Sequence, residues 1–176
     1  MTRIATAVLA LALPASAALA QVDASVVPED APDWLPMAAA VADAQENGKL
    51  LLVYTYASWC GYCARFDQNV FTDDSVQTYL AEHFAPVRVD LESEERVAFF
   101  DADVTMAELG AAMQITGTPT SVFVERDGSL ITKLPGYTDP ATYLLALRYV
   151  REEAYKTTPW DAYREANAAA ANSPGE

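Results

Sequence analysis

A Cys-x-x-Cys pair placed directly behind a short apolar run limits the fold of this chain more than any other feature. The run, Leu50–Tyr56, is bounded and followed by small residues, and it is typical of a buried central strand with helices on both faces. Trp59, Cys60 and Cys63 follow in the sequence Trp-Cys-Gly-Tyr-Cys, and they open a predicted helix that continues toward Gln68. The cysteines are therefore expected where a strand gives way to a helix N-terminus.

This position gives the two cysteines different expected chemistry. Free backbone N–H groups and the helix dipole stabilise an anion at a helix N-terminus, so Cys60 is predicted to be the attacking thiolate. Cys63 falls one turn further along the same helix face, within disulfide reach but more sheltered. Cys60 would attack a substrate disulfide, and Cys63 would then release the reduced product by attacking Cys60.

Two other uses of the cysteine pair stay open from the residues alone. A static structural disulfide would close a loop of four residues and remove little conformational entropy from the unfolded chain. A metal site would need further ligands, and the chain has two cysteines and one histidine, His83. His83 falls at the end of a predicted helix, which favours a surface or helix-end role over a catalytic one.

The rest of the pattern predicts alternating helices and strands. Helices are predicted at residues 37–47, 76–83 and 104–114 and from 139 onward, and strands at 86–91, 121–125 and 130–134. The segment Arg126–Ser129 contains an Asp-Gly pair, which indicates a hairpin turn between the last two strands. The charged stretch Glu92–Arg96 is interpreted as a solvated loop or a helix start. This order predicts an α/β domain with a central mixed β-sheet flanked by helices on both faces.

Two motifs together give the chain a family resemblance. Trp59–Cys63 after an apolar strand, with Gly117-Thr118-Pro119-Thr120 before the hairpin, resembles the thioredoxin superfamily over about residues 34–149. Within it, the chain is similar to bacterial periplasmic thioredoxin-like proteins, akin to the C-terminal domain of DsbD and to SoxW-type thioredoxins, on the segments Asn47–Lys49, Ala57–Trp59 and Val70–Asp74. The resemblance implies a thioredoxin-like fold and a thiol–disulfide oxidoreductase that uses no cofactor and no metal.

The resemblance also assigns roles to individual residues. It implies that Cys60 and Cys63 are catalytic and that substrate is bound by Trp59, Gly61, Tyr62, Thr118 and Pro119. It further implies a cis Thr118–Pro119 bond against the cysteine pair, which leaves backbone groups of Thr118 free to pair with an extended substrate. Trp59 would shelter the sulfurs, although a plain core aromatic is the other interpretation of this residue.

One position departs from the family pattern. Thioredoxins usually carry a buried aspartate six residues before the first cysteine, where this chain has Tyr54. A phenol with an ordinary pKa of about 10 is a poor base at neutral pH, so Tyr54 is interpreted as core. Deprotonation of Cys63 would then need water or another carboxylate, for which Glu125 and Asp90 are candidates by rough position.

Charge excludes two classes of partner. Lysine and arginine total 11 against 25 aspartate and glutamate residues, and the formal net charge is −14. Nucleic-acid binding and docking on anionic lipid both depend on positive side chains, so neither is expected. The acidity predicts a soluble, self-repelling surface, and we expect a monomer.

The ends of the chain predict its layout and location. Residues 1–20 have the three-part pattern of a signal peptide, with Arg3, an apolar stretch and a cut expected after Ala20. The apolar stretch is about half of the ~20 residues that a spanning helix needs, so a retained membrane anchor is the weaker interpretation. We expect an extended lead-in at 21–36, a thioredoxin-like domain at 37–156 and a helical extension with a frayed end at 157–176. We therefore expect the protein in the periplasm.

Several functions are compatible with these expectations. The first is a periplasmic reductase of protein disulfides, recharged by a membrane electron donor of the DsbD or CcdA type. A dithiol oxidase or disulfide isomerase would use the same residues at a more oxidising potential. A non-catalytic binding module and a copper-binding metallochaperone are the remaining alternatives.

Overall fold

The apolar run forms an inner strand of a four-stranded mixed sheet with the order β2-β1-β5-β6. The strands are β1 (Leu50–Tyr56), β2 (Phe84–Asp90), β5 (Thr120–Val124) and β6 (Leu130–Pro135). β1 is parallel to β2 and antiparallel to β5, and β5 is antiparallel to β6. The computed structural model describes Ala24 and residues 26–171 of the chain. The leader expected at 1–20 and the last five residues of the extension expected at 157–176, where a frayed end was predicted, lie outside this part.

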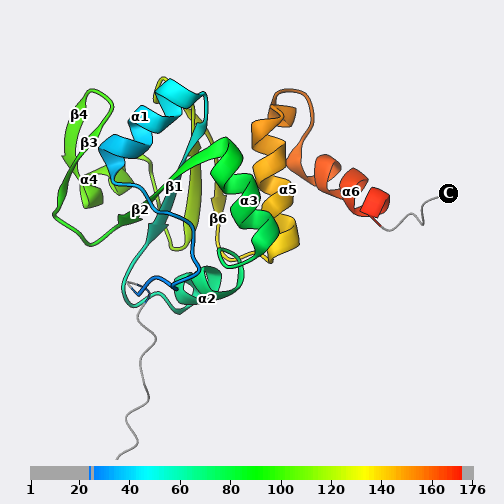
Figure 1. The fold of residues 1–176 in the computed structure, drawn as a ribbon, viewed down its shortest axis with the longest axis horizontal. Helices are drawn as coiled ribbons and strands as arrows, with labels where there is room; N and C mark the ends of the chain where they lie inside the picture. Colours follow the sequence, from blue (N-terminus) through cyan, green and yellow to red (C-terminus); the bar gives the residue numbers. More distant parts are fainter. Residues whose placement is uncertain (1–23, 25, 172–176) are drawn as a thin grey trace, which may run out of the picture.

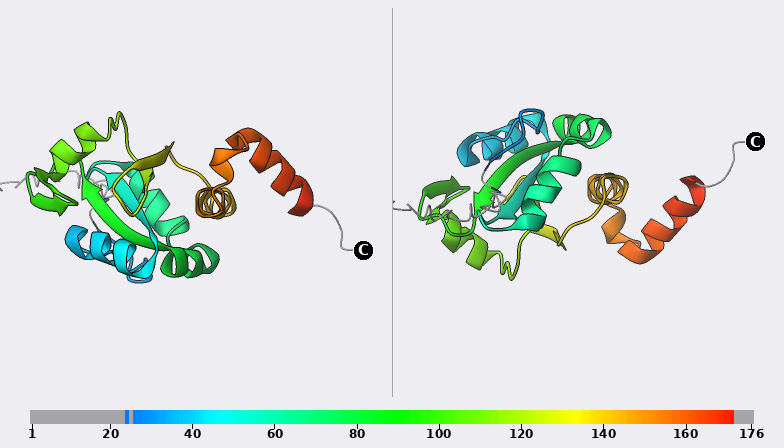
Figure 2. Two further views of the ribbon diagram at one scale, coloured as in Figure 1. Left: turned by 90° about the horizontal axis from the view of Figure 1, so that it is seen from above. Right: turned by 90° about the horizontal axis from the view of Figure 1, so that it is seen from below.

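Helices cover both faces of the sheet, as the sequence predicted (Figures 1 and 2). They are α1 (Met37–Asn47), α2 (Gly61–Asn69), α3 (Asp74–His83), α4 (Met106–Ala112), α5 (Pro140–Arg151) and α6 (Trp160–Ala171), with a 3₁₀ turn at Ala154–Lys156. Alternate residues of β1 face opposite layers. Leu52 and Tyr54 pack in the cluster that contains residues of α2, α3 and α5, whereas Leu51 and Val53 pack with residues of α1 and α4.

Local sequence sets the ends of these helices. The side chain of Asp73 accepts hydrogen bonds from two N–H groups at the start of α3, and Asp139 accepts one at the start of α5. Gly48 ends α1 with a positive φ of 71°, a conformation that favours glycine. Gly48 thus fixes the connection into β1, and the two aspartates fix the connections into α3 and α5.

The segment between β2 and α4 differs from the sequence prediction. A two-stranded hairpin, β3 (Arg96–Phe99) paired with β4 (Ala102–Thr105), occupies a stretch for which no strand was predicted, between the charged segment ending at Arg96 and the helix expected from Val104. The helix therefore begins at Met106 instead of Val104, because Thr105 and Glu108 form a reciprocal capping box. Met106 and Leu109 do lie on a helix, as predicted, but the sequence analysis placed the start of that helix two residues too early.

The two ends of the described chain follow different courses. Residues 26–36 (blue in Figure 1) run from beside α2 across β2 to α1. α6 projects away from the sheet and contacts α5 through an aromatic group of Tyr149, Trp160 and Tyr163. Within the described residues, no helix is both long and apolar enough to cross a membrane.

Candidate active site

The cysteine pair lies at the N-terminus of α2, where the sequence placed it. Cys60 is the N-cap residue of the helix and is joined to Cys63 by a disulfide, with 2.04 Å between the sulfurs. The backbone N–H of Cys63 donates to the sulfur of Cys60 over 3.1 Å. The same N–H would stabilise a thiolate on Cys60 once the pair is reduced.

The surroundings of the two sulfurs are unequal. Cys60 retains 5% of its surface and Cys63 none. Trp59 and Tyr62 on either side of Cys60 are 70% and 62% exposed, so the interpretation of Trp59 as a core aromatic is wrong. Gly61 is exposed, and a side chain added there would meet no atom within 4 Å. A partner that approaches this end of the sheet meets Cys60 first, between two exposed aromatic rings.

The proline loop lies at the same end of the sheet as the cysteines. Thr120, the first residue of β5, pairs with Thr55 near the end of β1, and the Thr55 hydroxyl donates to the Thr120 carbonyl over 3.0 Å. The Thr118–Pro119 bond is cis, and the Pro119 carbonyl accepts the N–H of Gly136. Since β1 leads into the cysteine loop, strand pairing brings all seven site residues expected from the sequence to one edge of the fold.

A further aromatic residue joins this edge. Tyr137, which follows β6, lies 6.3 Å from Tyr62 between ring centroids. The guanidinium carbon of Arg65 lies 4.8 Å above the Tyr137 ring, in a cation–π contact. The sequence analysis missed Tyr137 because it stands in a loop with no motif, and only the return of β6 beside β5 places it here.

Tyr54 occupies the interior behind the disulfide. It is fully buried, and its hydroxyl lies 3.4 Å from the carbonyl oxygen of Cys63, to which it donates. Burial and the nearby carboxylate of Asp67 raise the pKa of this phenol far above its ordinary value. Tyr54 is therefore a hydrogen-bond donor that braces α2, in agreement with its interpretation as core.

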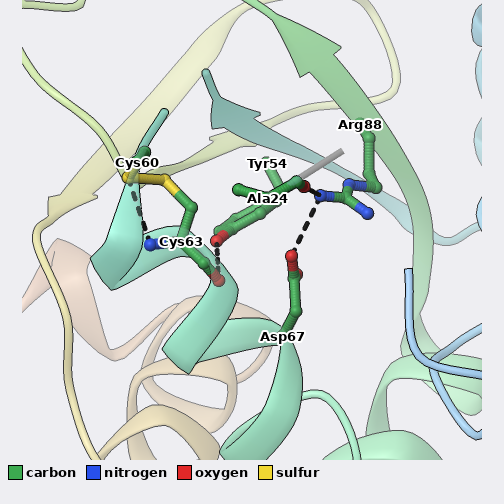
Figure 3. A network of polar contacts seen from close by, with 6 residues as sticks. All are labelled: Ala24, Tyr54, Cys60, Cys63, Asp67 and Arg88. Carbon is green, nitrogen blue, oxygen red and sulfur yellow. Dashed lines mark hydrogen bonds and ion pairs between the residues drawn. A yellow bond between two sulfur atoms is a disulfide. The ribbon is translucent and has the colours of Figure 1, made fainter. Parts of the chain in front are cut away.

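The buried carboxylate of this site comes from α2 itself. Asp67 follows Cys63 by four residues, one turn along the helix, and is 1% exposed (Figure 3). Its Oδ2 accepts from Arg88 of β2 over 3.0 Å, and Arg88 pairs in register with Tyr54. Burial raises the pKa of Asp67 to about 6, against the opposing effect of Arg88.

The two carboxylates proposed from the sequence have other partners. Glu125 follows the residue that pairs with Leu51, at the opposite end of β1 from the cysteines, and accepts from Tyr155. Asp90 accepts from the N–H of Glu92 in a turn after β2. A better signal was present in α2, where an acid follows Cys63 at the helical spacing of the buried face.

A metal site among the described residues would need a cluster of ligand side chains. No group of three or more histidine, cysteine, aspartate or glutamate side chains in this part of the chain is arranged to hold a metal ion. His83, at the end of α3, lies 3.8 Å from Glu82 and packs on Tyr79.

A mixed sheet between helical layers, with a Cys-x-x-Cys disulfide at the first helix after β1 and a cis proline before β5, defines a thioredoxin-fold thiol–disulfide protein. The family model of the thioredoxin-like domain matches residues 37–151, and the chain belongs to this family. It is thus a thioredoxin-like oxidoreductase with the redox pair Cys60–Cys63.

Several curated proteins are similar to part of this chain. The thiol:disulfide interchange protein DsbD of Yersinia pestis is 32% identical over 121 residues, which cover 65% of this chain and 18% of the relative. DsbD of Tatumella citrea is 29% identical over 111 residues, with 62% and 18% covered. The chain therefore spans less than a fifth of the length of these curated relatives.

Solved structures extend the likeness to the fold. A thioredoxin-fold protein from Helicobacter pylori has a TM-score of 0.61 and 22% identity, covering 74% of this chain and 91% of that chain. A thioredoxin from Thermus thermophilus has a TM-score of 0.57 and 29% identity, covering 68% and 87%. At 22% identity, the likeness to the Helicobacter pylori protein shows the fold alone.

Proposed function

We propose that the protein is a periplasmic reductase of protein disulfides. One observation carries the proposal: Cys60 at the helix N-terminus is the outer sulfur between exposed Trp59 and Tyr62, while Cys63 is buried behind it. An attacking thiol must reach its substrate, and a resolving thiol must be protected until the mixed disulfide has formed. The similarity to part of DsbD, a thiol:disulfide interchange protein, supports the same chemistry.

The proposed reaction moves two electrons from the reduced pair to the substrate. The Cys60 thiolate attacks one sulfur of a substrate disulfide, and the other substrate sulfur leaves as a thiolate. Cys63 then loses its proton and attacks the sulfur of Cys60. The mixed disulfide breaks, the Cys60–Cys63 disulfide forms, and the second substrate thiolate leaves. Each thiolate product takes up a proton according to its pKa.

We propose that Asp67 is the base that accepts the proton of Cys63. Residues four apart on a helix have Cβ atoms about 5–6 Å apart, so the carboxylate lies within reach of the thiol directly or through one water. The pKa of Asp67, raised to about 6 by burial, leaves it ionised at neutral pH yet more basic than an ordinary aspartate. Asp67 thus takes the role that Tyr54 cannot perform.

Five residues form the proposed substrate surface. Trp59 and Tyr62 supply apolar contact on either side of Cys60, and the bare backbone of Gly61 leaves room between them. The half-buried Thr118, held in place by Pro119, would pair its backbone with an extended substrate chain.

Cellular setting and partners form a second part of the proposal. The signal-peptide pattern at 1–20 supports export, with a mature chain made of the lead-in, the thioredoxin-like domain and the helical extension. A membrane donor of the DsbD or CcdA type would return two electrons to the Cys60–Cys63 disulfide after each cycle. Protein disulfides are the proposed substrates, and the monomer is the proposed working form.

The reduction potential of the Cys60–Cys63 couple tests the direction of electron flow. It is measured on the chain starting at Gln21 by equilibration with glutathione, with thioredoxin at about −270 mV and DsbA at about −120 mV as references. A value near thioredoxin is the expected result. A value near DsbA would overturn the reductase proposal and favour the oxidase or isomerase.

Trapping identifies the substrates. With Cys63→Ala the mixed disulfide on Cys60 cannot resolve, so substrate proteins stay covalently attached and are released by dithiothreitol. The matched control is Cys60→Ala, in which Cys63 stays buried and should trap nothing. Equal trapping by both variants would contradict the assignment of Cys60 as the attacking thiol.

A further inference from the structure

The N-terminal segment reaches the back of the cysteine pair through Ala24. This residue is fully buried and packs in one cluster with Ala57, Cys60, Cys63 and Ala64. Its N–H donates to the carbonyl of Ser58, two residues before Cys60, over 3.0 Å. The segment therefore contacts the redox site itself and not merely the outside of the domain.

The carbonyl of Ala24 shares the guanidinium of Arg88 with Asp67. Nη2 of Arg88 donates to the Ala24 oxygen over 2.8 Å and to Oδ2 of Asp67 over 3.0 Å (Figure 3). Arginine and carboxylate often pair through two parallel hydrogen bonds, which would occupy both carboxylate oxygens. Here Oδ1 of Asp67, and Nε and Nη1 of Arg88, are buried without a hydrogen-bond partner among the described residues. One carboxylate oxygen of Asp67 is thus left available.

The other end of the same segment is anchored beside the same arginine. The Trp34 ring stacks on Tyr54 at 5.8 Å and meets the edge of Phe71 at 4.8 Å. The guanidinium carbon of Arg88 lies 5.6 Å from the Trp34 ring, and the N–H of Leu35 donates to the Pro86 carbonyl over 2.9 Å. Ala24 and residues 26–36, called the strap below, are therefore held at both ends around Arg88.

We propose that the strap is a positioning element of the thiol site, which shields Cys63 and holds Arg88 so that Asp67 keeps one oxygen free to accept the Cys63 proton. The inference rests on the proposed roles of Cys63 and Asp67. It makes the lead-in before the thioredoxin-like domain part of the redox machinery.

Loss of the Ala24 contacts has two consequences. The wall of the cluster that faces Cys63 opens to solvent, so the thiol of the reduced protein becomes more accessible. Arg88 also loses its second acceptor and is free to turn two N–H groups toward Asp67, which makes the carboxylate a weaker base. The titratable and charged groups that interact with Asp67 are Arg88 of β2 and the phenol of Tyr54 of β1; on its own helix, Cys63 stands one turn before it.

The test measures alkylation of Cys63 alone. The chain starting at Gln21 is compared with the chain starting at Pro28, which lacks Ala24 but keeps Trp34 and Leu35, both carrying Cys60→Ala. Iodoacetamide rates are recorded from pH 5 to pH 10. We expect the shorter chain to react at least tenfold faster on the high-pH plateau, where all of the thiol is ionised. We also expect the lower of the two inflections in its curve of rate against pH, which follows the ionisation of Asp67, to shift to lower pH. Identical plateaus and profiles would overturn the proposal.

A second comparison separates positioning from mere packing. In the Asp67→Asn background, the shorter chain should still react faster on the plateau, but truncation should no longer move the inflection. A shift that persists without the carboxylate would show that the strap does not act through Asp67, and would overturn that part of the proposal.

Thermal unfolding shows whether truncation disturbs folding. For that case, two point variants of the chain starting at Gln21 replace the truncation. Ala24→Pro removes the N–H that bonds Ser58, and Val26→Pro, at an exposed position, is the matched control. The first should raise the Cys63 alkylation rate and the second should not; equal rates would overturn the proposal. These assays need no protein substrate. A negative result would therefore overturn the role of the strap while Cys60 and Cys63 still reduce a substrate disulfide, and a protein without reductase activity could still give the expected alkylation rates.

Discussion

Two arginine–aspartate pairs in this protein have almost the same contact distance and opposite surroundings. Arg88 and Asp67 meet at 3.0 Å with side chains 8% and 2% exposed, between β2 and α2. Arg96 and Asp103 meet at 3.2 Å with side chains 56% and 72% exposed, across the β3–β4 hairpin. The chemical groups are identical, so any difference in their effect comes from burial and from what lies next to them.

The comparison indicates what each pair contributes. Exposed pairs are screened by water and contribute little, so Arg96 and Asp103 do no more than help to hold a short hairpin. A buried pair loses hydration and is weak evidence for stability, above all when three of its polar atoms lack partners in the described structure. The position of Asp67 one turn from Cys63 fits the role in thiol chemistry that we propose for the buried pair, and the exposed pair has no such position.

Removing the arginine from each pair should give the largest contrast. Arg88→Met leaves a buried carboxylate without its cation and should lower the free energy of unfolding by about 3 kcal/mol. Arg96→Met leaves its partner in water and should cost less than about 1 kcal/mol. Denaturant unfolding of the oxidised proteins measures both. Equal losses would mean that burial does not distinguish the pairs.

The pH dependence of stability should report the buried carboxylate next. Burial raises the pKa of Asp67 from 3.8 to about 6 in the folded protein. As pH rises from 4 to 6, the unfolded chain therefore loses the proton of Asp67 before the folded protein does, and stability falls. Relative to Asp67→Asn, the native protein should lose on the order of 2 kcal/mol between pH 4 and pH 7. A constant difference between the two curves would contradict the raised pKa.

A third carboxylate supplies a control of the opposite sign. The backbone N–H of Thr142 holds the pKa of Asp139 below its ordinary value at the start of α5. Asp139 therefore adds stability at neutral pH that is lost as the pH falls through its folded pKa. Relative to Asp139→Asn, the native protein should become less stable as the pH is lowered, and the two aspartates should give curves that slope in opposite directions.

The aspartates of the two pairs should also differ in their effect on catalysis, by less than the stability differences above. Asp67→Asn should slow the step in which Cys63 resolves the mixed disulfide roughly tenfold at pH 7, since a general base is lost. The defect should shrink near pH 9, where about half or more of an ordinary thiol is ionised without help. Asp103→Asn should leave the rate unchanged. Single-turnover kinetics with a small disulfide substrate measure the step, and equal rates for the two variants would remove Asp67 from the mechanism.

Local signals account for what the sequence predicted of the fold. The apolar run of β1, the Asp73 and Asp139 caps and the Asp-Gly turn each act within a few residues, and each predicted element is present. The β3–β4 hairpin was missed because Arg96–Phe99 and Ala102–Thr105 are short and partly exposed, so neither strand shows a clear apolar alternation. Its stability depends on pairing, which a local pattern does not report.

The site divides in the same way. Cys60 and Cys63 could be found from their spacing behind the apolar run, and the Thr118–Pro119 pair from the resemblance to the thioredoxin superfamily. Asp67 also stood at helical spacing from Cys63, although the sequence analysis passed over it. Arg88 and Ala24 could not be found in this way, because they come from β2 and the lead-in and reach α2 only when β2 lies parallel to β1. Arg88 alternates with Val87 and Val89 and resembles the outward residue of a half-exposed strand. Its burial follows from the strap and α2, which cover that face.

Salt should expose the smallest difference between the two pairs. Each pair is put through a double-mutant cycle, with Arg→Met and Asp→Asn, at 0.05 M and 1 M NaCl. The Arg96–Asp103 coupling should begin within about 0.2–1 kcal/mol and vanish at 1 M, where the screening length falls to about 3 Å. The Arg88–Asp67 coupling should be unaffected, because counterions cannot approach side chains that α2, β2 and the strap enclose. If salt weakened both couplings equally, water and ions would have to reach Arg88, and the strap could not be the seal on which the chemistry of Cys63 is proposed to depend.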